Sequence, residues 1–174
     1  MKIGRLFPDL LATLGGAASS EAGFARTLKR LVTLSGARAG ALRFRPHEGA
    51  PVDLVVGARP GSALDRWLRA RLEPPRRGVR LEKPAARPPG LKDRDQVLLG
   101  AALGDPRHPT GALVLVGRGG ARGLTRETLP PSFAREFGHA LEHVWRLRQR
   151  TIRLEVINQI TALSGTTLSL ERIY

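Results

Sequence analysis

The sequence predicts an α+β domain, in which an antiparallel sheet carries helices on one face and a long C-terminal helix follows. Two pairs of apolar runs, each pair joined by a turn, indicate β-hairpins at 39–56 and 97–116. Apolar residues at spacings of three and four indicate helices before the first hairpin and after the second. Hairpins with helices at both ends favour this arrangement.

Residues 1–36 predict two helices. The first carries Leu10 and Leu14 on an apolar face and breaks near Gly16. The second restarts at Ser19, because a serine hydroxyl can accept a hydrogen bond from the free N–H groups of a helix start, and ends at Gly36.

The first hairpin consists of an alternating run at 39–45, a turn, and a returning strand at 52–56. Ser62 then caps a short helix, which ends at Pro74 and Pro75 because proline cannot continue a helix.

A long loop or lid is expected at 73–94, which is rich in proline, arginine and glycine. Only Val79 and Leu81 suggest a strand within it. The second hairpin follows, with strands at 97–103 and 111–116 and a turn at 104–109.

The last third of the chain predicts one long helix. Thr125 is expected to cap its start, with Glu127 in the first turn. An apolar face recurs along it at Phe133, Phe137, Ala140, Val144 and Leu147. No glycine or proline lies between Gly138 and Gly165, so a continuous helix of about 25 residues or more is expected.

Composition limits the possible functions. An apolar fraction of 41% over 174 residues is enough for one packed domain and an appendage. Cysteine is absent, which excludes disulfides, thiolate metal sites and cysteine nucleophiles. A net charge of +14 could serve nucleic-acid binding, but the arginines are scattered and aromatic residues make up only 5%, which argues against it.

No apolar run approaches the length of a membrane span, and Pro8 and Asp9 interrupt the only stretch that resembles a secretory signal. The sequence therefore predicts a cytoplasmic location.

Three motifs suggest a function but have simpler interpretations. The glycine-rich stretch 117–123 has Arg122 where a dinucleotide-binding loop needs its third glycine, so we interpret it as a flexible connection. His139 and His143 could share a helix face around zinc, but no third ligand is evident, so no metal site is predicted. No arrangement of residues suited to catalysis is present, and none is predicted.

A possible internal repeat links the two ends of the chain. Leu11 and Leu14 match Ile157 and Ile160, and small residues follow both pairs. Either a second module begins near Ile157, or two amphipathic helix starts merely look alike.

The C-terminal third resembles a known family. Leu124-Thr-Arg-Glu-Thr-Leu129, then Phe133-Ala134, then Ala140-Leu-Glu142, resembles the closing helix of a GAF domain. Thr110-Gly-Ala-Leu-Val-Leu115 is similar to the strand before that helix, and residues 154–173 look like a linker helix leading into another module. Pro130 and Pro131 depart from the family pattern, because they break the first turns of its helix.

The resemblance implies a GAF/PAS-like antiparallel sheet of about five or six strands, terminal helices packed together on one face, and a ligand pocket on the other. It places the sensory domain at 1–147 and the linker helix, with the start of a following module, at 148–174. Bilin attachment is excluded without cysteine, and the Asn-Lys-x-Asp-Glu signature of the cyclic-nucleotide-binding members is missing. Haem would need His47 or His108, and loop histidines are usually solvated, so no cofactor is identified.

The leading hypothesis is a sensory domain of a two-component histidine kinase that forms a homodimer through its terminal helices. The chain itself would not be an enzyme, and an output domain would follow it. The alternatives are a basic nucleic-acid-associated module and a ligand-free structural GAF domain. The ligand is unknown, and the pocket candidates are Arg59, Trp67, Arg71 and Leu99.

Overall fold

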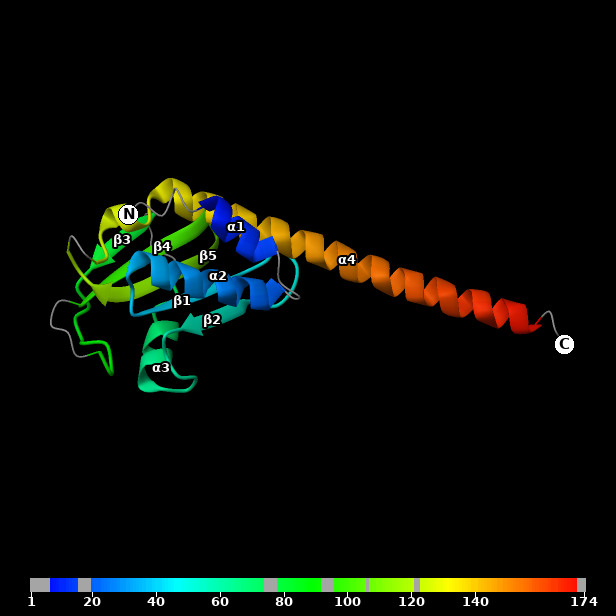
Figure 1. Cartoon of the computed structure of the whole chain (residues 1–174), viewed down its shortest axis with the longest axis horizontal. Coiled ribbons are helices and arrows are strands. Elements are labelled where there is room, and N and C mark those ends of the chain that lie inside the picture. Colours follow the sequence, from blue (N-terminus) through cyan, green and yellow to red (C-terminus); the bar gives the residue numbers. More distant parts are fainter. Residues whose placement is uncertain are drawn as a thin grey trace.

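A five-stranded antiparallel sheet forms the centre of the part of the chain that the computed structural model describes, which is residues 7–15, 20–73, 78–91, 96–105, 107–120 and 123–171. The strand order is β2-β1-β5-β4-β3 (Figure 1). The strands are β1 (Ala39–Phe44), β2 (Val52–Val56), β3 (Val79–Glu82), β4 (Gln96–Asp105) and β5 (His108–Arg118). Both predicted hairpins are confirmed, as is the strand around Val79 and Leu81.

Helices α1 (Phe7–Gly15), α2 (Ser20–Ser35) and α4 (Pro131–Glu171) pack together on one face of the sheet. The short helix α3 (Ala63–Arg69) lies apart from them, beside β1 and β2 (Figure 1). Ser62 caps α3, because its hydroxyl accepts a hydrogen bond of 3.2 Å from the Asp65 N–H. The predicted α+β class, with the terminal helices on one face, is therefore confirmed.

The sheet has an apolar layer on each face, because successive side chains of a strand point to opposite faces. One layer packs against α1, α2 and α4, and the other packs against α3. On the face of α1, α2 and α4, Leu42, Leu99 and Leu115 pack beneath Phe24 and Phe137. On the α3 face the strands contribute a smaller cluster. It comprises Ala39, Ala41, Leu68, Leu72, Leu98, Val114 and Val116, with Trp67 and Leu91 packed against it.

The long helix does not begin where the sequence predicts. Thr125 precedes a 3-10 turn, η2 (Arg126–Thr128), and α4 starts only at Pro131. Proline fits the first position of a helix because its fixed φ suits the helix and its missing N–H is not needed there. It disfavours helical backbone in the residue before it, so Pro130 cannot belong to the same helix. Pro131 therefore sets the start of α4.

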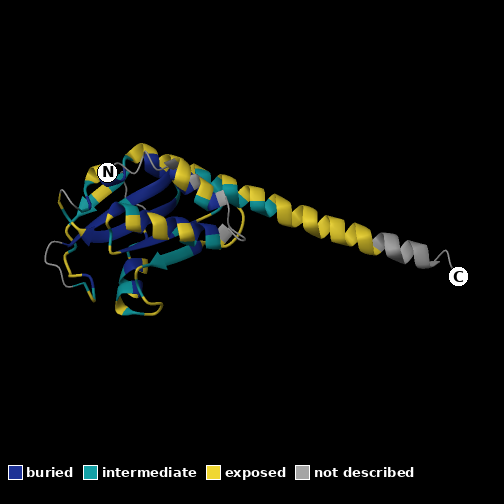
Figure 2. Cartoon of the chain, viewed as in Figure 1, coloured by how far each residue is buried: buried dark blue, intermediate teal, exposed yellow. Residues whose placement is uncertain are grey.

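The predicted continuity of this helix is confirmed, since α4 runs for 41 residues from Pro131 to Glu171. Its apolar face is shorter than expected. The buried residues end at Leu141, Val144 is half-buried, and Leu147 is 48% exposed, so Leu147 was wrongly included in that face. Figure 2 shows the change from a buried to an exposed helix along α4.

The second hairpin is longer than predicted, because β4 and β5 stay paired as far as Asp105 and His108. A bulge between Leu103 and Gly104 lets the pairing continue. Helix α3 ends at Arg69, before the predicted stop at Pro74, so the predicted end of this helix was wrong. The prolines at 74 and 75 themselves, and the predicted features at Gly16, Arg122 and Tyr174, lie outside the described residues. Within the described residues, no helix is both long and apolar enough to cross a membrane.

Candidate functional site

Two of the four predicted pocket residues meet at α3. The Arg71 guanidinium carbon lies 3.8 Å from the centre of the Trp67 ring. The same guanidinium donates a 3.2 Å hydrogen bond to the Trp67 carbonyl. A guanidinium over an indole face is a cation–π contact. Trp67 and Arg71 therefore form one local unit on the α3 face of the sheet.

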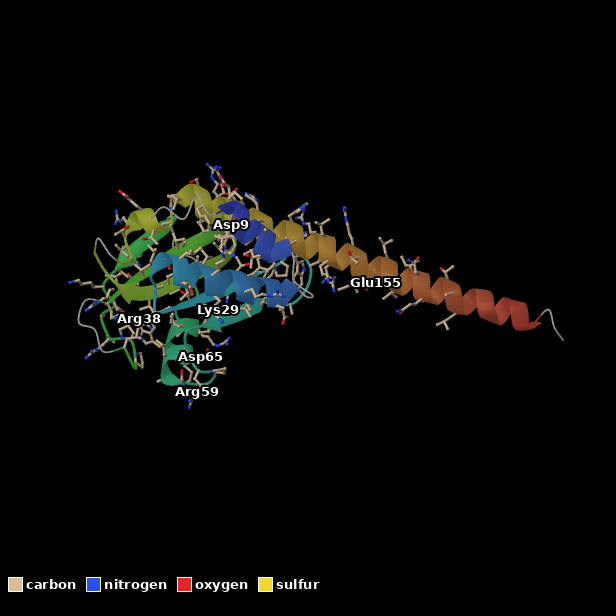
Figure 3. All side chains as sticks on the ribbon, viewed as in Figure 1. Asp9, Lys29, Arg38, Arg59, Asp65 and Glu155 are labelled. Carbon is tan, nitrogen blue, oxygen red and sulfur yellow. The ribbon has the colours of Figure 1, made fainter. Side chains whose placement is uncertain are left out.

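The other two predicted residues lie elsewhere. Leu99 is fully buried on the opposite face of the sheet, in the layer beneath α1, α2 and α4, while its neighbour Leu98 faces α3. Arg59 is exposed in the turn before α3, and its side chain extends outward (Figure 3). The structure therefore brings Trp67 and Arg71 together, separates Leu99 from them, and leaves Arg59 at the edge.

An ion pair that the sequence analysis missed lies on the same face. Arg43 on β1 and Asp53 on β2 are directly opposite in the hairpin. The Arg43 side chain donates to both carboxylate oxygens of Asp53, at 2.8 and 2.6 Å. It also donates to the carbonyl of Leu72, just after α3, at 3.2 Å. The sequence does contain a signal for this ion pair, because Arg43 and Asp53 carry opposite charges and lie opposite each other when the predicted hairpin is paired.

This pair shifts the titration of Asp53. Hydrogen bonding from Arg43 lowers the pKa of the Asp53 carboxyl below its ordinary value, although partial burial acts in the other direction. A carboxyl with a lowered pKa in the folded state stabilises the protein at every pH above its unfolded-state value of about 3.9. That contribution is lost as the pH falls through the folded-state pKa.

We therefore expect Asp53→Asn to lower the free energy of unfolding by about 2 kcal/mol at neutral pH, because it leaves the Arg43 charge half-buried without its partner. The difference from the parent protein should shrink below about pH 4. Urea unfolding at several pH values measures both effects. Glu82→Gln is the matched control, because Arg80 in the Arg80–Glu82 pair is 69% exposed and solvent screens it. Equal losses in the two variants would contradict a special role for Asp53.

The indole N–H of Trp67 is an unused donor. In the part of the chain that the structure describes, Trp67 Nε1 is buried and has no hydrogen-bond partner. A buried donor without an acceptor costs about 1–3 kcal/mol. A bound molecule with a carbonyl or similar acceptor would remove this cost.

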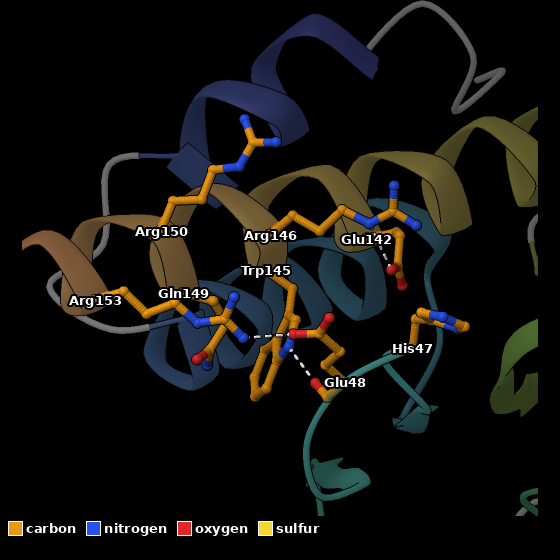
Figure 4. Close-up of a pocket in the computed structure, with 8 residues that line it drawn as sticks. All are labelled: His47, Glu48, Glu142, Trp145, Arg146, Gln149, Arg150 and Arg153. Atoms are coloured by element: carbon orange, nitrogen blue, oxygen red, sulfur yellow. Dashed lines mark hydrogen bonds and ion pairs between the residues drawn. The ribbon is translucent and has the colours of Figure 1, made fainter.

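A cavity of about 350 Å³ lies where α4 leaves the domain (Figure 4). We call it the helix-base cavity. Its lining is mostly charged and comes from the β1–β2 turn and from α4: His47, Glu48, Glu142, Trp145, Arg146, Gln149, Arg150 and Arg153. Arg146 donates to Glu142 at 3.0 Å, and Arg150 points away from Glu48, toward α1 (Figure 4).

Glu48 and Gly49 of the β1–β2 turn hold α4 from one side of this cavity. The Trp145 indole donates to the Glu48 carbonyl at 2.9 Å, and the Arg153 guanidinium lies 2.6 Å from the Glu48 carboxylate (Figure 4). The Trp145 ring also contacts the rings of Phe24 and Phe44, with centroids 6.4 and 6.1 Å away. We name Glu48, Gly49, Trp145 and Arg153 the helix clasp.

The histidines do not converge. His139 and His143 are exposed on α4, and His108 is exposed at the tip of the β4–β5 hairpin. Among the described residues, no three His, Asp or Glu side chains are grouped as a metal site would need.

Comparison with known proteins finds similarity to solved structures. No protein-family model matches the chain, and no curated protein matches it. The crystal structure of the A. aeolicus Nlh2 GAF domain in an inactive state matches with 13% sequence identity and a TM-score of 0.47. The match covers 83% of this chain and 95% of that one. These values are too low to transfer a ligand or a partner from that domain.

Proposed function

We propose that this chain is a sensory or regulatory module of the GAF type, which passes a binding event through α4 to a domain that follows it. Two things support the proposal. The motifs around Leu124 and Ala140 resemble the closing helix of that family, and the sheet with terminal helices on one face has the architecture that the resemblance implied. A cytoplasmic two-component histidine kinase remains the proposed context.

The observation that carries the proposal is the exposed half of α4. The helix packs on the domain core as far as Trp145 and then continues without a break to Glu171. We call residues 147–171 the exit segment. Over residues 147–163, where the structure describes side-chain exposure, it exposes seven large apolar side chains, which is unusual for a helix that stays in water. They are Leu147, Ile152, Leu154, Val156, Ile157, Ile160 and Leu163.

The spacing of these side chains fits a second copy of the same helix. Val156, Ile160 and Leu163 follow one another at intervals of four and three, as core positions of a coiled coil do, and Ile152 and Ile157 flank them. Four arginines at 146–153 precede this seam, and like charges from two parallel helices would repel each other. We therefore propose a parallel dimer whose helix contact begins beyond Arg153.

Ile160→Asp tests the dimer. A buried charge on each helix should weaken association at least tenfold, because it removes two apolar side chains and leaves two unpaired carboxylates in the seam. Asn158→Asp is the matched control, since it adds the same charge on the opposite side of the helix. Sedimentation equilibrium measures both dissociation constants. A monomeric parent protein at high concentration, or equal weakening by both changes, would overturn the dimer.

The proposed ligand face is that of α3, where Arg71 lies over the Trp67 ring and the buried Trp67 indole N–H has no acceptor. On this proposal the sensory unit comprises 1–147 and the linker 148–174. The chain itself has no catalytic role, and any enzymatic output belongs to the domain that follows.

A further inference from the structure

The β1–β2 hairpin contacts both the α3 region and α4. Near α3, Arg43 donates to the Leu72 carbonyl at 3.2 Å, and Arg69 lies 3.5 Å from the Asp53 carbonyl. Arg43 and Asp53 are paired with each other across the hairpin. A displacement of the α3 region therefore acts on the Arg43 side chain of β1 and on the Asp53 backbone of β2.

The turn of the same hairpin holds α4. Phe44 and Val52 form the last pair of the ladder before the turn, immediately after the Arg43–Asp53 pair. The turn then supplies Glu48 to Trp145 and Arg153, which lie about two helical turns apart on α4. Two adjacent residue pairs of this ladder, Arg43–Asp53 and Phe44–Val52, therefore lie between the contacts to α3 and the turn that contacts α4.

Gly49 makes the fit of this turn against α4 tight. Its φ is +113°, a conformation that other residues rarely adopt. A Cβ atom at this position would lie 3.0 Å from Cζ2 of Trp145. Any side chain here would push the Trp145 ring away from the turn.

We propose that the β1–β2 hairpin mechanically couples the α3 region to the exit segment, with the helix clasp as its contact to α4. This inference rests on the proposed sensory function and adds the route by which it would work. Binding on the α3 face shifts Arg43 and Asp53, the hairpin carries the shift to Glu48, and the hold on Trp145 and Arg153 changes. A contiguous chain of contacts of this kind carries coupling only if changing one end alters the other.

The chain offers a direct test, because its two tryptophans lie at the two ends of the route. We would incorporate 5-fluorotryptophan, record fluorine NMR spectra, and assign the two signals with Trp67→Phe and Trp145→Phe. Gly49→Ala should shift the Trp145 signal through direct contact and should also shift the distant Trp67 signal by more than its linewidth. Glu48→Gln removes only the charge opposite Arg153, in a solvent-exposed pair, and keeps the backbone carbonyl that accepts from Trp145, so it should shift the Trp67 signal less than Gly49→Ala does.

Gly120→Ala is the matched control. Gly120 has a φ of +103°, and no atom lies within 4 Å of the Cβ it would gain. It should leave both signals in place. Asp53→Asn should abolish the response of Trp67 to Gly49→Ala, because it interrupts the middle of the route.

An unchanged Trp67 signal in both Gly49→Ala and Glu48→Gln would overturn the proposal. Equal shifts in Gly120→Ala would overturn it as well, because they would show a general response to loosened structure. Circular dichroism establishes that each variant is folded. Sedimentation of the same samples tests the dimer separately, so a monomeric protein would remove that part of the proposed function and leave the coupling measurement valid.

Discussion

Gly138→Ala is expected to lower the free energy of unfolding by about 3 kcal/mol or more, although alanine is the better helix former by about 1 kcal/mol. The reason is the closeness of α4 to the bulge in β4. A Cβ atom on Gly138 would lie 2.7 Å from Gly104 Cα and from the Leu103 carbonyl carbon. These are backbone atoms of a paired strand, which cannot rotate away as a side chain would.

The helix would have to lift from the sheet to admit this methyl group, which would loosen Phe137 and Leu141 as well. Thermal unfolding should show a midpoint lower by about 6–12 °C for a chain of this size. Gly165→Ala, in the same helix, is the control, and propensity alone predicts an unchanged or slightly higher midpoint. A stabilised Gly138→Ala variant would disprove the close approach of α4 to β4.

Phe24→Ala is expected to cost about 4 kcal/mol, because it empties a fully buried site where α2, β1 and α4 meet. The Phe24 ring packs edge-on against Phe44, with centroids 5.4 Å apart, and lies beside Trp145. Removing it should destabilise the fold and also loosen the ring that takes part in the helix clasp. Urea unfolding measures the first effect, and tryptophan emission in a Trp67→Phe background measures the second.

Phe24→Leu separates lost volume from lost aromatic contact. A leucine keeps most of the buried volume, so its cost should stay below about 1.5 kcal/mol. If leucine and alanine destabilise the protein equally, the edge-on aromatic contacts rather than packing volume account for the loss.

Much of the fold could be predicted from local patterns. The alternation of apolar and polar residues at 39–45, with turn residues after it, is enough to predict the first hairpin. Both signals lie within one short segment of the chain. The absence of glycine and proline between Gly138 and Gly165 is enough to predict that the helix is uninterrupted over that stretch. The predicted start of α4 at Thr125 was wrong, because the prolines at 130 and 131 prevent one helix from running through them and α4 begins only at Pro131.

The candidate site was predicted only in part. Trp67 and Arg71 are one helical turn apart, so their contact follows from the spacing of α3. Leu99 lies on the opposite face of the sheet from Trp67, and the sequence could not show this, because in the apolar run 97–103 nothing in the strand itself distinguishes one face from the other. A shift of one residue reverses every side chain of a strand.

The sequence by itself therefore determined the order and kind of the elements, the two hairpins and the uninterrupted C-terminal helix. These depend on residues close together in the chain, where periodicity, capping and the absence of helix breakers act. Only the tertiary structure decided which strand residues face α3, that Gly138 lies against Gly104, and that Glu48 holds Trp145 and Arg153. Those contacts join residues far apart in the chain, and they depend on how the sheet and helices pack, which no local pattern specifies.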